Sequence, residues 1–140
     1  MPSALKDLPG VRFHPEAHLV TWHPTGVFDD ALADRVVEFL ESEERLDGQA
    51  FHRFTDFNGL TEIRLTCGHV FQVAARRRAS YGGRERVKSA FFCECDVSLG
   101  IVHTYEILME GGPIKVHAFG TRRGAAEWLG VPIHLLQPNL

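Results

Sequence analysis

The second half of the sequence alternates twice between a strand pattern and a helix pattern. Residues 87–95 read as a strand with one face formed by Val87, Ser89, Phe91, Cys93 and Cys95. Residues 101–109 carry apolar side chains at helical spacing, and Gly111-Gly112-Pro113 stops that helix. A strand at Ile114–Phe119 and a short helix capped by Thr121 and ended by Gly130 follow. Strands that alternate with helices predict an α/β fold with a largely parallel sheet.

The first half adds a hairpin and two more helix patterns. Val11–His14 and Leu19–His23 predict a β-hairpin around Pro15-Glu16. Asp29–Glu41 has helical period, and Asp29 or Asp30 can cap its first turn. Ala50–Thr55 is strand-like, and a further helix pattern runs through Ile63, Cys67, Val70, Phe71 and Ala74. The predicted order is β-β-α-β-α-β-α-β-α, with about five strands in a mixed, mostly parallel sheet and four helices.

Length and composition restrict the class of protein. The 140 residues predict one domain at 11–130, with an N-terminal extension at 1–10 and a C-terminal tail at 131–140 that lies on the surface or packs on a partner. A net charge of −3 gives no field to attract nucleic acid or a membrane surface, and no apolar run approaches the roughly 18 residues of a membrane span. We expect no signal peptide, and the odd number of cysteines favours the reducing cytoplasm.

Three segments carry a resemblance to a known family. They are Val20–Glu41, Phe54–Leu60 and Ser89–Gly130, the last including Gly100, Tyr105-Glu106, Phe119 and Trp128-Leu129. With these residues the chain resembles the STAS domain, and in particular the SpoIIAA-like, or STAS/SEC14-like, small bacterial proteins. The resemblance covers about residues 11–130 and implies their fold, but the matching residues are mostly core and turn positions. It therefore implies little about chemistry.

The loop that resembles the phosphorylation switch of STAS antagonists lacks its hydroxyl groups. In those proteins a serine in this loop precedes a helix and receives a phosphate, which a helix N-terminus stabilises. The equivalent residues here are Asp56, Phe57, Asn58 and Gly59. We therefore expect no phospho-switch, with Asn58 or Thr61 capping the following helix and Asp56 ending a strand. A weaker alternative is that the bare N–H groups of this loop attract an anion.

The resemblance also implies a pocket between the helices and the sheet. The candidates to line it are Phe71, Phe92, Tyr105 and Trp128. We expect a non-enzymatic domain that binds a small apolar or lipid-like ligand or a protein partner. The first alternative is a homodimeric interaction or regulatory module, assembled through the edge hairpin or the tail, since an unpaired edge strand invites pairing.

A basic stretch closes the second expected helix and continues into the loop after it. Its members are Arg76, Arg77, Arg78, Arg84 and Arg86. They form either a patch for an acidic partner or phosphate group, or a solvated helix end and loop. No aromatic residues interleave with them in the way that single-strand binders require, so we expect no nucleic-acid partner.

The remaining alternative is an enzyme or metal protein that uses histidine or cysteine. Cys93 and Cys95 share a predicted strand face, and His117 falls on a neighbouring strand, so a zinc site is conceivable. However, Cys-x-Cys is not the usual chelating spacing, and free cysteine is often a small core residue. His103 and Glu106 can interact on one helix face. No nucleophile elbow, phosphate loop or dinucleotide fingerprint is present, so we expect no catalytic set, no metal and no cofactor.

Overall fold

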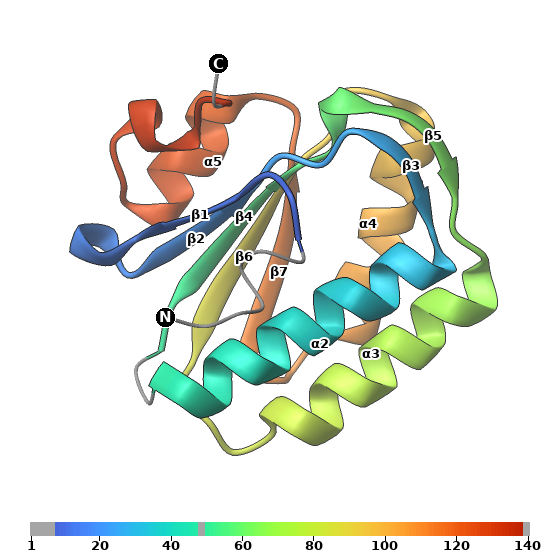
Figure 1. Cartoon of the computed structure of the whole chain (residues 1–140), viewed down its shortest axis with the longest axis horizontal. Helices are drawn as coiled ribbons and strands as arrows, with labels where there is room; N and C mark the ends of the chain where they lie inside the picture. The colour runs from blue at the N-terminus through green and yellow to red at the C-terminus, as the bar shows by residue number, and fades with distance from the viewer. Residues whose placement is uncertain (1–7, 48–49, 139–140) are drawn as a thin grey trace.

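The main sheet has five strands in the order β1-β2-β4-β6-β7. The computed structural model describes residues 8–47 and 50–138 (Figure 1). The strands are β1 (Val11–His14), β2 (Leu19–Trp22), β4 (His52–Asp56), β6 (Val87–Phe92) and β7 (Ile114–Phe119). The β1–β2 pair is antiparallel, and the other three pairs are parallel. The predicted mixed, mostly parallel sheet with an N-terminal hairpin is confirmed.

In the part of the chain that the structure describes, four helices cover the two faces of this sheet, as predicted. Helices α2 (Asp30–Asp47), α3 (Cys67–Tyr81) and α4 (Asp96–Leu108) lie together on one face, and α5 (Arg122–Leu129) lies on the other (Figure 1). Each strand–helix–strand unit from β2 to β7 therefore crosses over the same face. The chain changes face only after β7, when it enters α5.

The alternation along β6 separates two cores. Val87 and Phe91 pack in the larger core beneath α2, α3 and α4. Ala90 and Phe92 pack in the smaller core beneath α5. The two faces predicted for this strand are therefore the two faces of the sheet, and Ser89 points with Val87 and Phe91 toward the three-helix side.

Several helix ends follow the predicted capping residues. The Asp29 carboxylate accepts a hydrogen bond of 2.9 Å from the backbone N–H of Leu32 at the start of α2. The Thr121 hydroxyl accepts one of 3.0 Å from the N–H of Gly124 in α5. Gly130 ends α5 with a φ of 74°, a conformation that costs glycine little.

A second, two-stranded parallel sheet was missed by the sequence patterns. Strand β3 (Gly26–Asp29) pairs with β5 (Leu60–Arg64). The prediction that Ile63 belongs to the following helix is wrong, because Ile63 lies on β5 and α3 begins at Cys67. Leu60 and Ile63 lie three residues apart, a spacing that by itself favours a helix, and the strand follows from the pairing of β5 with β3.

The start of α3 is fixed by Thr66 rather than by Asn58 or Thr61. The Thr66 hydroxyl accepts a hydrogen bond of 3.2 Å from the N–H of His69. The Asp30 carboxylate accepts two further bonds, from the Thr66 N–H at 3.0 Å and the Thr66 hydroxyl at 3.1 Å. The predicted capping by Asn58 or Thr61 is therefore wrong, and the true cap joins the starts of α2 and α3.

The C-terminal tail packs on its own domain. A 3-10 turn, η3 (Ile133–Leu136), buries Leu136 completely in the core with Leu19 and Phe54. The Nε2 atom of His23 lies 2.9 Å from the Leu136 carbonyl oxygen. The tail is thus anchored to its own domain through Leu136, while residues 132–134, 137 and 138 are exposed, as expected for a surface tail. Residues 139–140 fall outside the described residues.

The chain before β1 also contributes to the fold. Leu8 is buried in the larger core, and the Trp22 indole N–H donates a hydrogen bond of 3.0 Å to the Pro9 carbonyl. The rest of the expected extension, residues 1–7, lies outside the described residues. Among the described helices, none combines the length and the apolar composition that a bilayer crossing needs.

Candidate functional site

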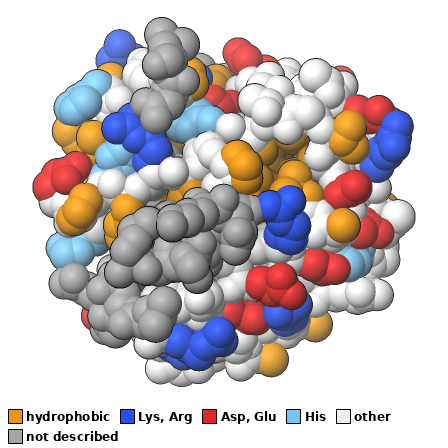
Figure 2. Space-filling model, viewed as in Figure 1, with side chains coloured by type: hydrophobic (Ala, Val, Ile, Leu, Met, Phe, Trp, Pro, Cys, Tyr) orange, Lys and Arg blue, Asp and Glu red, His pale blue; other side chains and the backbone are white. Residues whose placement is uncertain are grey.

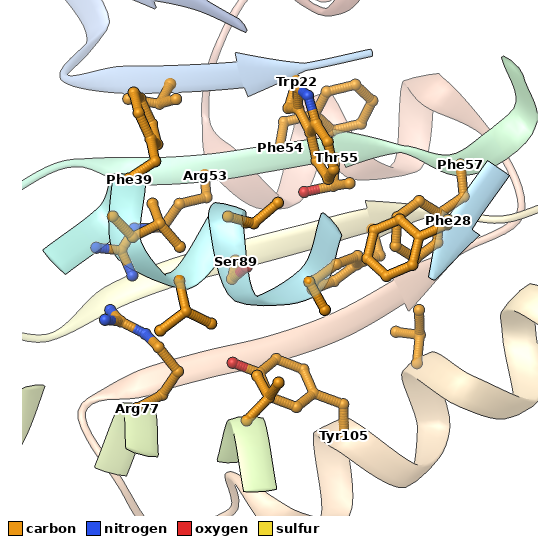
Figure 3. Close-up of a pocket in the computed structure, with 18 of the residues that line it drawn as sticks. Trp22, Phe28, Phe39, Arg53, Phe54, Thr55, Phe57, Arg77, Ser89 and Tyr105 are labelled. Atoms are coloured by element: carbon orange, nitrogen blue, oxygen red, sulfur yellow. The ribbon is translucent and has the colours of Figure 1, made fainter. Parts of the chain in front are cut away.

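A cavity of about 120 Å³ lies between the main sheet and helices α2, α3 and α4. Its surface is mostly apolar, and α2 and α4 contribute aliphatic side chains such as Ala33, Val37 and Val102. Apolar cavities near this size, about 150 Å³, stay dry and accept a ring such as benzene. The cavity therefore has the chemistry and the size of a site for a small apolar group (Figure 3).

Aromatic side chains form one end of the cavity. The rings of Phe28 and Phe57 have centroids 5.2 Å apart, and those of Phe57 and Phe91 are 5.5 Å apart. Tyr105 continues this chain, 6.1 Å from Phe91 in an edge-to-face arrangement. The short 3-10 turn η2 (Phe57–Gly59), between the main sheet and the two-stranded sheet, brings Phe57 into this cluster. Such pairs hold rings in defined orientations, which favours a preformed site.

Three hydroxyl groups come from the sheet and from α4. Thr55 on β4, Ser89 on β6 and Tyr105 on α4 all line the cavity, and their oxygens lie toward its middle in Figure 3. Burial raises the pKa of Tyr105, so its hydroxyl stays protonated at neutral pH and can donate. A largely apolar pocket with a few convergent polar groups is typical of small-molecule sites.

A buried charged cluster forms the other end. The Glu44 carboxylate of α2 accepts hydrogen bonds from Arg53 at 2.6 Å and from Arg77, whose Nη1 is 3.1 Å from Oε1 and whose Nη2 contacts Oε2. Arg53 is 5% exposed and Arg77 is 1% exposed. Burial lowers the pKa of Arg53, and the nearby Glu44 carboxylate opposes that effect. Both arginines line the cavity.

One nitrogen of this cluster has no hydrogen-bond partner. The Nε atom of Arg53 is buried and makes no hydrogen bond among the described residues. The guanidinium lies 4.6 Å from the Phe51 ring centroid and 5.1 Å from that of Tyr81. These ring contacts stabilise the cation, but they leave the Nε–H donor unused.

Only one of the four predicted pocket residues lines the cavity. Tyr105 does, whereas Phe71 is 55% exposed on α3. Phe92 and Trp128 lie on the opposite face of the sheet, where Phe92 faces the Arg122 guanidinium and Trp128 packs against Phe119. The placement of Phe71, Phe92 and Trp128 in the cavity is therefore wrong. The reason is that Phe92 and Trp128 belong to the core beneath α5.

The loop that resembles the STAS switch does not lead directly into an α-helix. Turn η2 leads directly into β5. The Asp56 carboxylate accepts from the Asn58 N–H at 2.9 Å and pairs with Arg122 at 3.1 Å, while the Asn58 side-chain oxygen accepts from the Glu94 N–H at 2.8 Å. Gly59 is exposed and ends the turn. Asp56 and Asn58 therefore tie three loops together, and Phe57 becomes a wall of the cavity.

The predicted basic residues do not form one patch. Arg77 is buried, and Arg76 pairs with Glu41 at 2.8 Å. Arg78 donates to the carbonyls of Leu108 and Glu110, and Arg84 lies over the Tyr81 ring. On the face drawn in Figure 2, Lys and Arg side chains are interspersed with Asp and Glu. Arg86 is exposed in the loop before β6. The patch interpretation is corrected accordingly, because most of these cations have local partners.

The cysteines and histidines considered for metal do not converge in the described part of the chain. Cys93 is buried in the larger core, and burial raises the pKa of its thiol to about 11. Cys95 is exposed, and a hydrogen bond with Ser98 lowers the pKa of its thiol. His117 lies on the other face of the sheet, packed against Phe119 and Trp128. No group of three His, Cys, Asp or Glu side chains suited to a metal occurs among residues 8–47 and 50–138.

Comparison with known proteins identifies the fold but does not indicate an activity. No family model matches the chain, and no curated protein does. Among solved structures, the chain is similar to an uncharacterised protein of the DUF3478 family with a SpoIIAA-like fold from Shewanella loihica PV-4. The TM-score is 0.54 at 14% identity, over 86% of this chain and 90% of that protein. The resemblance in the sequence is thereby confirmed at the level of the fold.

Proposed function

From the premise that this chain is a SpoIIAA-like domain, we propose that it is a non-enzymatic binding protein for a small, mainly apolar molecule. The observation that carries this proposal is the cavity lined by Phe57, Phe91 and Tyr105, with hydroxyl groups at its centre. A core filled only for stability would be packed without such a space, because each void loses dispersion contacts. The ligand would replace those contacts.

The size of the cavity limits the ligand. A volume of about 120 Å³ accommodates a single ring or a short alkyl chain. A long lipid chain would require α2 or α4 to move away from the sheet. We therefore favour a compact ligand over a long-chain lipid.

Native mass spectrometry of the protein after mild purification tests this function. We expect a fraction of molecules to carry a small adduct that is released on denaturation. The variant Ala33→Leu adds carbon atoms to the cavity wall, since Ala33 is buried there, and should lose the adduct. Ala31→Leu, the same change at an exposed position of α2, should keep it.

Two results would overturn the proposal. One is a mass equal to the bare chain after mild purification, together with no binding of added benzene-sized compounds. The other is equal occupancy in Ala33→Leu and Ala31→Leu, which would place the adduct elsewhere. Co-purification of a second polypeptide in place of a small molecule would instead favour the interaction module, which is the alternative predicted from the sequence.

A further inference from the structure

We infer that the ligand is a small carboxylic acid, with its carboxylate toward Arg53 and its apolar part among Phe28, Phe57 and Phe91. This inference rests on the proposed function, because it specifies the ligand of the same cavity. It depends on three observations: an unused buried donor, the charges at the polar end of the cavity, and the position of the hydroxyl groups.

The unused donor is the Nε–H of Arg53. Its side chain is almost fully buried, so bulk water does not satisfy this group. A buried donor without an acceptor costs about 1–3 kcal/mol, and more for a charged group. An unsatisfied buried group in a folded protein requires an explanation, and an acceptor supplied by a bound molecule is one. A carboxylate matches the geometry of a guanidinium group.

The charges on the cavity wall favour an anion. Arg53 and Arg77 line the cavity and share one carboxylate, that of Glu44. Glu43 is buried on the same helix, but it is not among the residues that line the cavity. Buried charges require pairing because transfer from water is costly. A ligand carboxylate would pair the second arginine without any change in the protein.

The hydroxyl groups supply further donors in the middle of the cavity. Ser89 and Tyr105 line the cavity with their oxygens toward its middle, and the guanidinium groups of Arg53 and Arg77 lie together at one side (Figure 3). Burial raises the pKa of Tyr105, so its hydroxyl is a neutral donor at neutral pH. A carboxylate has about four acceptor sites and can use several donors at once.

The rest of the cavity determines the remainder of the ligand. The aromatic chain from Phe28 through Phe57 and Phe91 offers faces and edges to a ring. A volume near that of a benzene-binding cavity leaves space for one ring or a short chain. Small aromatic acids and short-chain fatty acids combine this apolar part with the required carboxylate.

The test compares benzoate with benzyl alcohol, which has the same ring but no charge. Calorimetric titration of the full chain should show benzoate binding at least about tenfold more tightly, as expected for hydrogen bonds to charged groups. Arg53→Met should remove this preference while benzyl alcohol affinity changes by less than about threefold. Arg76→Met is the control, because Arg76 is exposed and pairs with Glu41 outside the cavity.

Each result separates the inference from the proposed function. Equal affinity for the two compounds in the wild-type protein overturns the carboxylate inference and leaves the binding function standing. If neither compound binds, the carboxylate inference and the proposed binding function are both overturned. If Arg53→Met does not fold, Tyr105→Phe replaces it, and benzoate affinity should fall by about threefold or more while benzyl alcohol binding persists. An unchanged benzoate preference in the folded variants contradicts the inference.

Discussion

At the level of single residues, Glu44 holds a buried charge cluster together. Its carboxylate is the shared partner of Arg53 and Arg77, and all three side chains are buried. Removing one member of a buried ion pair leaves an uncompensated charge, which is much more costly than losing an exposed pair. The same cluster forms the polar end of the cavity, so its stability and the proposed function are linked.

The first prediction concerns Glu44→Gln. We expect it to lower the free energy of unfolding by about 3–5 kcal/mol, because two buried guanidinium groups lose their shared carboxylate. Urea denaturation measures this loss. The matched control is Glu41→Gln, which breaks the more exposed pair with Arg76 and should cost about 1 kcal/mol or less. Similar costs for the two variants would contradict the assignment of a buried cluster.

The second prediction concerns His52 and pH. Its Nδ1 accepts a hydrogen bond of 2.9 Å from the Lys88 N–H, and burial, followed by the charges of Lys88 and Arg53, lowers the pKa of its ring from 6.5. The unfolded chain therefore binds this proton more readily than the folded chain. The stability contribution is complete above about pH 6.5 and is lost as pH falls toward the lower folded pKa.

We expect His52→Asn to reduce this pH dependence, because the amide oxygen can accept the same bond without titrating. The free energy of unfolding, measured at pH 7.5 and at pH 5, should fall less in the variant than in the wild-type protein. The same substitution at the exposed His103 serves as the control. A steeper fall in His52→Asn would mean that protonated His52 is favourable in the folded state.

At the level of elements, the start of α3 depends on a cap that joins two helices. Thr66 caps α3 and is itself bound by the Asp30 carboxylate at the start of α2. We expect Thr66→Ala to destabilise the protein by about 1 kcal/mol, the usual cost of a lost N-cap. The control Thr61→Ala removes an exposed hydroxyl on β5 and should change stability by less than about 0.5 kcal/mol. A larger loss of stability in Thr61→Ala than in Thr66→Ala would instead support the cap expected from the sequence.

The elements that the sequence predicted best are those with clear breaks at their ends. Ile114–Phe119 and Val11–His14 were predicted at their observed bounds, and Thr121 and Gly130 mark the observed ends of α5. Strands β3 and β5 were missed because their apolar residues do not alternate: Val27 and Phe28 are adjacent, and Leu60 and Ile63 are three residues apart, as on a helix. The position of α3 was consequently extended toward the N-terminus.

The residues of the cavity were harder to predict than the fold. Arg53 and Thr55 alternate with Phe54 along β4, and this alternation alone does not show that their face lies beneath three helices. Nothing in the local pattern shows that Glu44, nine residues earlier, neutralises Arg53. The pairing depends on how α2 packs against β4, which is tertiary information. Phe71 was placed in the pocket because helical spacing does not show which apolar residue of a helix faces outward.

At the level of the whole molecule, the fold explains where a ligand site can form. Helices α2, α3 and α4 all lie on one face of the main sheet, while the two-stranded sheet closes one end beside them (Figure 1). The cavity occupies this three-helix side. The opposite face is filled by α5 and the tail, including the fully buried Leu136. The homodimer stays a prediction. The tail, one of the two segments expected to form it, packs on the core of its own domain.

The most direct test of the central claim is the crystallographic electron density inside the cavity of protein purified under mild conditions. We predict density for a compact molecule that protein atoms do not explain, with its polar end beside Arg53 and its body against Phe57 and Phe91. A cavity occupied only by ordered water, or closed by the movement of those side chains even after soaking with benzoate and with benzyl alcohol, would contradict the binding function.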